Sequence, residues 1–198
     1  MKTKTRTKVT FDISMSLDGF ITGPNEGVGN PLGDDEGRLH DWMFADKTDA
    51  DGEVLDEVYA TTGAILMGRR MFDVGEEPWG DPPPFHMPVF ILTHEAREPI
   101  PKQGGTTYTF ATGGIQEALE RARAAAGDKN VGIWGGANIM RQYLKAGLLD
   151  EMQIHLVPVL LGGGVRLFED RGPERIQLKR TRTIQTPSAT HLRFTVIK

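Results

Sequence analysis

The chain has 198 residues, no cysteine and a formal net charge of −4, and 38% of its residues are hydrophobic. This composition is typical of a folded globular protein and excludes intrinsic disorder. The lack of cysteine excludes a thiol nucleophile, a disulfide framework and a thiolate metal site, and it favours the cytoplasm. No apolar run reaches the ~18 residues that span a bilayer, and the basic amino terminus lacks the apolar segment of a signal peptide, so we expect no membrane partner.

The charge is unevenly distributed along the chain. Four basic residues lie in the first eight positions, so the rest of the chain has 19 basic and 27 acidic residues. An acidic folded body argues against a nucleic-acid partner, which requires a basic surface. We predict a basic tail over residues 1–8 and a single domain over residues 9–198, which is long enough to bury a core without disulfides or metals.

The first part of the chain alternates predicted strands and helices. Apolar and polar residues alternate from Val9 to Leu17, which predicts a strand that ends at the Asp18-Gly19 turn. The glycine-rich loop from Gly19 to Gly37 is long for a compact domain, and such loops are usually functional or mobile. Beyond the loop we predict a short helix at Leu39–Phe44, a longer helix at Asp51–Thr61 and a buried strand at Ala64–Met67.

The same alternation continues before it gives way to strands alone. The patterns predict a helix from Arg69, an irregular segment at Pro78–Pro88, strands at Val89–Leu92, Thr106–Phe110 and Val131–Trp134, a helix capped by Thr112 and ending at Ala126, and a helix that closes at Gly147. After Asp150 they predict strands around Met152–Leu156, Ile176–Thr186 and Ala189–Ile197. We therefore predict an α/β domain whose mainly parallel sheet has an antiparallel carboxyl-terminal edge.

Three predicted strand ends have residues suited to a phosphate ligand, and ligands of α/β sheets bind at such ends. They are Met67-Gly68-Arg69-Arg70, Leu92-Thr93-His94 and Trp134-Gly135-Gly136-Ala137-Asn138. The glycine pair leads into a helix, where backbone N–H groups and the helix dipole favour an anion. Arginine forks match phosphate oxygens. The alternative interpretation is that the glycines serve tight packing and the arginines are solvated.

Other sites for common chemistry are not predicted. The chain has no P-loop and no G-x-S-x-G motif, and the glycine pair Gly27-x-Gly29 runs into Pro31 and lies well past the first strand, unlike a Rossmann fingerprint. The five histidines show no helical pairing, so we predict no metal site.

Four motifs in order make the chain similar to a known family. They are Met15-Ser16-Leu17-Asp18-Gly19-Phe20-Ile21, Leu66-Met67-Gly68-Arg69-Arg70-Met71-Phe72, Phe90-Ile91-Leu92-Thr93 and Gly132-Ile133-Trp134-Gly135-Gly136-Ala137. The chain resembles the dihydrofolate reductase-like family from about Val9 to Ile197, and within it the reductase domain of the bifunctional riboflavin-biosynthesis deaminase-reductase. The resemblance implies the three-layer dihydrofolate reductase-like fold, a homodimer and a nicotinamide dinucleotide cofactor, normally NADPH. Without cysteine, the zinc-dependent deaminase half is not expected.

The resemblance also implies a site. The cofactor-binding residues it implies are Gly68, Arg69, Arg70, Met71, Thr93, His94, Gly135, Gly136, Ala137, Asn138 and Ile139. The first six would lie by the adenosine ribose and its 2′-phosphate, and the last five by the pyrophosphate. The Ser16–Gly19 turn would lie near the nicotinamide and the substrate.

The implied activity is hydride transfer from NADPH to a small polar heterocycle of the pyrimidine or pterin type, as in a 5-amino-6-(5-phosphoribosylamino)uracil reductase, or to a carbonyl compound. Asp18 and Asp41 are candidate catalytic proton donors, although an ordinary turn aspartate and a helix-surface aspartate are the alternatives. Trp42, Phe44 and Phe85 are candidate substrate walls, although large aromatics are more often core residues. Two other functions stay open: a dinucleotide-binding protein without efficient turnover, such as a sensor or an inactive paralogue, and a structural homodimer.

Overall fold

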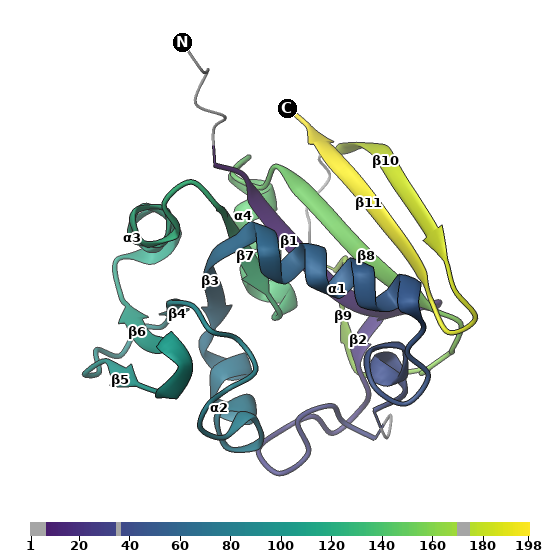
Figure 1. The fold of residues 1–198 in the computed structure, drawn as a ribbon, viewed down its shortest axis with the longest axis horizontal. Coiled ribbons are helices and arrows are strands. Elements are labelled where there is room, and N and C mark those ends of the chain that lie inside the picture. The colour runs from purple at the N-terminus through teal and green to yellow at the C-terminus, as the bar shows by residue number, and fades with distance from the viewer. Residues whose placement is uncertain (1–6, 35–36, 170–174) are drawn as a thin grey trace.

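The computed structural model of this chain describes residues 7–34, 37–169 and 175–198 (Figure 1). Most of the predicted tail, residues 1–6, therefore lies outside the described residues. Lys8 already belongs to the sheet, because its carbonyl accepts a hydrogen bond from Val131 N and its own N–H donates to Asn130 Oδ1. No helix in the described part of the chain is long and apolar enough to cross a membrane.

A nine-stranded sheet forms the centre of the domain, with the order β10-β11-β8-β1-β7-β3-β4-β6-β5. Its parallel strands are β1 (Val9–Ser16), β3 (Thr62–Gly68), β4 (Val89–Leu92), β6 (Thr107–Ala111), β7 (Asn130–Trp134) and β8 (Glu151–Val157). Antiparallel strands occupy both edges, namely β5 (Ile100–Pro101), β10 (Gln177–Gln185) and β11 (Thr190–Ile197). The predicted parallel sheet with an antiparallel carboxyl-terminal edge is confirmed.

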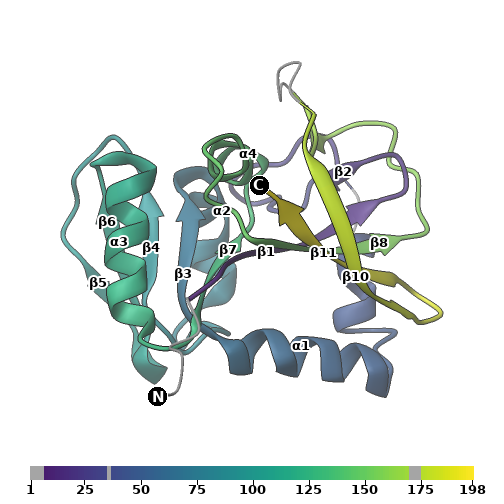
Figure 2. The same cartoon turned by 90° about the horizontal axis from the view of Figure 1, so that it is seen from above.

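Helices cover both faces of this sheet, which gives three layers (Figure 2). The helices are η1 (Arg38–Met43), α1 (Asp49–Thr61), α2 (Arg69–Trp79), η2 (Gln103–Gly105), α3 (Gly114–Ala126) and α4 (Ala137–Lys145). Helices α3 and α4 pack on one face, and α1 and α2 pack on the other. Helix α2 continues through Pro78, where an irregular segment was predicted.

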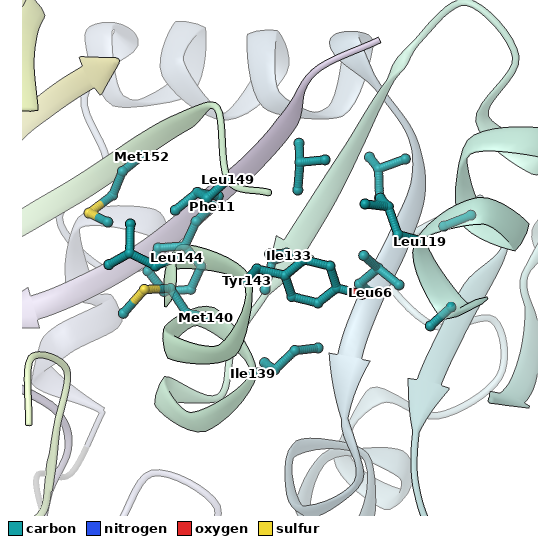
Figure 3. Packing of buried hydrophobic residues seen from close by; sticks show 14 of the residues in the cluster. Phe11, Leu66, Leu119, Ile133, Ile139, Met140, Tyr143, Leu144, Leu149 and Met152 are labelled. Carbon is teal, nitrogen blue, oxygen red and sulfur yellow. The ribbon is translucent and has the colours of Figure 1, made fainter. Parts of the chain in front are cut away.

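The largest part of the core lies between the sheet and α3 and α4. Phe11 and Ile133 of the sheet contribute to it, together with Met140 and Tyr143 of α4, as Figure 3 shows. Met152 and Ile154 belong to the same cluster, with exposures of 0% and 5%. The chain's own α4 covers this face of β8, so these two residues are not available to form a dimer surface.

The glycine-rich loop contains a short strand that the sequence pattern does not predict. It contains β2 (Phe20–Thr22), which pairs with β9 (Val165–Arg166) in a small second sheet. A side chain at Gly164 would collide with the carbonyl of Thr22, so the glycine run at 162–164 permits this close approach. Further along, Asp34 accepts hydrogen bonds from the amides of Asn25 and Asn30, which holds the loop together.

Candidate functional site

The carboxyl ends of the parallel strands meet at one edge of the sheet, as the sequence predicts. Gly68 at the end of β3 is in register with Leu92 at the end of β4, and Leu66 is in register with Ile133 of β7. The turns that follow β3, β4 and β7 therefore lie side by side. Strand β1 is in register with β7 only up to Asp12, so its residues 13–16 run beyond the end of β7, alongside the turn that begins at Gly135.

Three helices begin at this edge with a glycine in place of a polar cap. The residues that precede α2, α3 and α4 are Gly68, Gly113 and Gly136, and within the described chain none of these helices has a side-chain cap. Helix α1 differs, because Thr48 and Asp51 form a complete capping box at its start. Uncapped N–H groups and the positive end of the helix dipole favour an anion. Thr112, in contrast to its predicted role, does not cap α3, because Gly113 precedes that helix.

The Gly135-Gly136 turn forms a cradle that a side chain would fill. Both glycines have positive φ, 83° and 80°, a conformation that L-residues rarely adopt. A Cβ atom at Gly135 would lie 2.7 Å from the Sδ atom of Met71, which faces the turn from α2. The first N–H groups of α4, which no side chain caps, can bind an anion. The geometry therefore fits a phosphate group between the starts of α2 and α4.

The two arginines of the Gly68-Arg69-Arg70 turn are both paired with carboxylates of the chain. Arg69 Nε lies 2.7 Å from Asp73 Oδ1, and its Nη1 lies 3.3 Å from Glu95 Oε2. The hydrogen bond that Arg69 donates to Asp73 raises the pKa of Arg69 above its ordinary value. Arg70 reaches the long loop, where its Nη2 lies 2.6 Å from Glu26 Oε2. A ligand phosphate at Arg69 has to share the guanidinium with two carboxylates.

The end of β4 supplies the remaining predicted contacts. Thr93 Oγ1 accepts a hydrogen bond from Glu95 N, and His94 is exposed. The Arg97 guanidinium lies 4.9 Å from the centroid of the Phe110 ring, beside the same strand end. On the other turn, Asn138 Oδ1 accepts from Gln142, one helical turn further along α4. The predicted cofactor residues are thus gathered at one edge, although most of them also contact other residues of the chain.

The predicted proton donors have different surroundings. Asp18 accepts hydrogen bonds from Ser16 Oγ, Leu161 N and Gly162 N. The hydrogen bond from Ser16, with smaller contributions from these backbone groups, lowers the pKa of Asp18 to about 2. An aspartate held this firmly as an acceptor is a poor proton donor, so the geometry gives Asp18 a structural role in the turn. Asp41 is half-exposed on η1 and its role stays a prediction.

The predicted substrate walls divide according to their burial. Trp42 and Phe85 are core residues, with exposures of 1% and 4%. Phe85 packs edge-on against Trp79 and Trp134, and Trp42 packs over two histidine rings. Neither is available to a ligand in this conformation, because neighbouring side chains cover both of them. Phe44 is 75% exposed and stays a candidate.

A buried polar cluster beneath Trp42 was not predicted. It contains Asp12, Asp51, His155 and His191, and both histidines are less than 4% exposed. The sequence offers one signal for it, because Asp12 and His155 occupy polar positions of strands whose alternate residues are apolar. Among the described residues, no group of three or more potential metal ligands is arranged to hold a metal ion.

Comparison with known families decides the relationship of the chain. Residues 7–192 match the RibD C-terminal domain. The chain belongs to the RibD C-terminal domain family. The protein YyaP of Bacillus subtilis, whose function is uncharacterized, is 26% identical to this RibD C-terminal domain over 182 residues, which is 89% of this chain and 87% of YyaP. YwjB of the same organism is 26% identical over 190 residues, 88% of this chain and 91% of YwjB.

Solved structures share the fold of this RibD C-terminal domain. A protein from Shewanella sp. PV-4 assigned to riboflavin biosynthesis has a TM-score of 0.71 at 24% identity, covering 98% of this chain and all of that one. A pyrimidine reductase-like protein of Corynebacterium diphtheriae has a TM-score of 0.63 at 13% identity, covering 97% and 92%. RibD of Acinetobacter baumannii has a TM-score of 0.64 at 17% identity, covering this whole chain but 59% of that one. The predicted dihydrofolate reductase-like fold is confirmed.

Proposed function

We propose that this RibD C-terminal domain is an NADPH-dependent reductase that transfers hydride to a small polar heterocycle of the pyrimidine or pterin type, or to a carbonyl compound. The observation that carries the proposal is the paired left-handed glycine turn, Gly135-Gly136, which opens α4 beside the uncapped start of α2. A dinucleotide has two linked phosphates that such a turn can hold through backbone N–H groups. The family relationship supports the same assignment.

In this proposal the residues of the chain bind and orient both reactants. Gly135 and Gly136 hold the pyrophosphate through their N–H groups, and Arg69, Thr93 and His94 lie at the adenosine end. NADPH supplies the hydride when it is bound. Residues 13–16 of β1, which continue past the end of β7, form the floor at the other end, where the nicotinamide and the substrate would meet. The exposed side chain of Leu17, whose N–H donates to Val159 O, flanks this end.

The test is calorimetric titration with NADPH and NADH, followed by an oxidation assay at 340 nm (a standard wavelength for NADPH) with separate pyrimidine, pterin and carbonyl substrates. We expect NADPH binding and turnover with at least one substrate class. Binding without turnover across all three classes supports the alternative, a dinucleotide-binding sensor or inactive paralogue. Absence of binding by a folded protein contradicts the proposal and leaves a structural role.

The role of Arg69 at the 2′-phosphate gives a separate prediction. Arg69→Ala is expected to weaken NADPH binding about tenfold and NADH binding much less, because only NADPH has the phosphate that pairs with the guanidinium. Arg121→Ala is a matched control, since Arg121 forms the same kind of i,i+4 ion pair, with Glu117, on α3. Equal losses for both cofactors in Arg69→Ala would remove Arg69 from the 2′-phosphate site.

We also propose a homodimer in the cytoplasm. The support is the family resemblance, the absence of cysteine, and the outer strand β10, most of whose residues from Gln177 to Gln185 are exposed on both faces. The outer edge of β10 has backbone N–H and C=O groups with which a second chain can pair. Light scattering coupled to size exclusion measures the mass in solution, and a mass of one chain at micromolar concentration would contradict the dimer.

A further inference from the structure

Two buried histidines lie end to end between two aspartates, on the face of the sheet that α1 and η1 cover. The Nδ1 atoms of His155 (β8) and His191 (β11) are 2.7 Å apart. His155 Nε2 lies 3.0 Å from Asp12 Oδ1 of β1, and His191 Nε2 lies 2.8 Å from Asp51 Oδ1 of α1. Four elements are therefore joined by three consecutive contacts, each at hydrogen-bond distance.

These three contacts determine how many protons the cluster holds. Each contact joins two atoms that have lone pairs, so each requires one proton to be a hydrogen bond. Two neutral imidazoles supply only two protons. Three hydrogen bonds therefore require one additional proton, carried either by an imidazole as imidazolium or by an aspartate as carboxylic acid. The count is the same for either carrier, and the net charge of the four groups is −1.

Neighbouring groups stabilise the cluster in the state with three protons. Asp51 Oδ2 accepts hydrogen bonds from both the N–H and the hydroxyl of Thr48, and the Trp42 ring lies 4.2 Å from the His155 ring and 4.8 Å from the His191 ring, between centroids. The Trp42 Nε1–H donates to Ser14 Oγ at 2.9 Å, which fixes the indole over the histidines. The cluster is thus shielded from water on the side of η1.

We infer that the Asp12–His155–His191–Asp51 cluster is a proton-binding site that holds one proton beyond two neutral imidazoles, so that its hydrogen bonds between α1 and the sheet are complete only within a pH window. A fourth proton would make both Nδ1 atoms donors and break the central hydrogen bond. Loss of the third proton would leave one contact with lone pairs on both sides, either between the two Nδ1 atoms or between an imidazole and a carboxylate. Either change breaks at least one of the three hydrogen bonds that join β1, β8, β11 and α1.

Other charged groups approach the cluster from each packed element. On β8, Gln153 Nε2 donates to Asp12 Oδ2, and on β11, Arg193 donates to Gln153 Oε1. Glu57 of α1 pairs with Arg193 at 2.6 Å and also with Arg182 of β10. Hydrogen bonds from Arg193 and Arg182 lower the pKa of Glu57, so this outer pair keeps its charges throughout the neutral range. Trp42 is the residue that η1 places over the rings, and it does not titrate.

The free energy of unfolding depends on pH with opposite slopes on the two sides of the window. Burial, together with the charge of His155, lowers the pKa of His191, which opposes a second positive charge on the pair. Below pH ~6.5 the unfolded chain binds two protons at these histidines and the cluster one, so unfolding becomes more favourable as the pH falls. Above pH ~6.5 the unfolded histidines are neutral while the cluster keeps its proton, so unfolding becomes more favourable as the pH rises.

The experiment compares unfolding constants of the wild type and of the double variant His155→Gln/His191→Gln, by urea denaturation between pH 5 and 8. We expect the stability difference to have a maximum near pH ~6.5 and to approach a tenfold change in the unfolding constant per pH unit on each side. His86→Gln, at an exposed histidine, is the control and is expected to give no such maximum. A difference that rises to a plateau above pH ~6.5 would mean two neutral imidazoles and would overturn the inference.

If the double variant does not fold, NMR spectra of the wild-type protein still test the inference. Long-range ¹H–¹⁵N correlation spectra of ¹⁵N-histidine protein at pH 7 report the protonation of each ring nitrogen, and His155→Gln and His191→Gln singly assign the signals. Three protonated nitrogens among the four of the pair support the inference, as do two protonated nitrogens together with a carboxylic-acid ¹³C signal from Asp51 or Asp12. Two protonated nitrogens with both carboxylates ionised contradict it.

Discussion

Asp51→Ala is expected to lower the free energy of unfolding by about 3–5 kcal/mol, since removing one partner of a buried charged pair leaves the other without compensation. The Asp51 side chain is fully buried, and three groups depend on it: His191 Nε2, the Thr48 hydroxyl and the Thr48 N–H. The change therefore removes the side-chain half of the α1 capping box that Asp51 contributes, together with the end of the histidine cluster. Burial raises the pKa of Asp51, but hydrogen bonds from Thr48 and His191 outweigh this effect and bring the pKa below its ordinary value. This direction agrees with an ionised Asp51 carboxylate in the cluster.

Urea denaturation at pH 7 measures this effect, with Asp49→Ala as the matched control. Asp49 is an exposed acidic residue in the same first turn of α1, so its loss removes only a favourable interaction with the helix dipole, about 0.3–1 kcal/mol. If Asp51→Ala costs no more than Asp49→Ala, the buried cluster does not stabilise the fold.

Gly135→Ala is expected to reduce the affinity for NADPH by at least about tenfold, or 1.4 kcal/mol. The new methyl group would lie 2.7 Å from Met71 Sδ, so either the methyl or the displaced thioether would occupy the cradle proposed for the pyrophosphate. The backbone would also be strained, because φ is 83° at this position.

The control for Gly135→Ala has to share its backbone strain. Gly147→Ala does so, because Gly147 has φ 67° and nothing within 4 Å of the added Cβ atom. Both variants are expected to lose stability through the same backbone strain, with a further loss in Gly135→Ala from the displacement of Met71, while only Gly135→Ala loses NADPH affinity in calorimetry. Similar affinities in the two variants would show that the Gly135 cradle does not contact the cofactor.

The two aspartates predicted as proton donors differ in their surroundings. Asp18, with its pKa lowered to about 2, is an acceptor in the turn that ends β1, and it ties this turn to the backbone at Leu161 and Gly162. Asp41 is half-exposed on η1. The histidine cluster lies behind Ser14, close to the end of β1 where the substrate would bind, yet Trp42 covers it. Loss of the cluster's hydrogen bonds outside the proposed pH window would therefore affect the positions of η1 and α1.

Local patterns in the sequence determined most of the central strands and helices and the position of the proposed cofactor site. The alternation from Val9 predicted β1, and the apolar run Ala64–Met67 predicted a strand buried between neighbours. The turn at Gly135 was recognisable because a phosphate cradle needs glycine at consecutive positions of the chain. Parallel strand ends must meet at one edge, so three separate turns were brought together correctly without a structure.

Only the tertiary structure decided which polar groups are partners. His155 and Asp12 are 143 residues apart in the sequence, and His191 and Asp51 are 140 apart, so no local pattern relates them. The pairing of Arg69 with Glu95 and the burial of Trp42 also depend on packing between distant elements. Composition and periodicity indicate which secondary structure one segment prefers. A proton site shared by three strands and one helix exists only after the chain has brought these elements into contact.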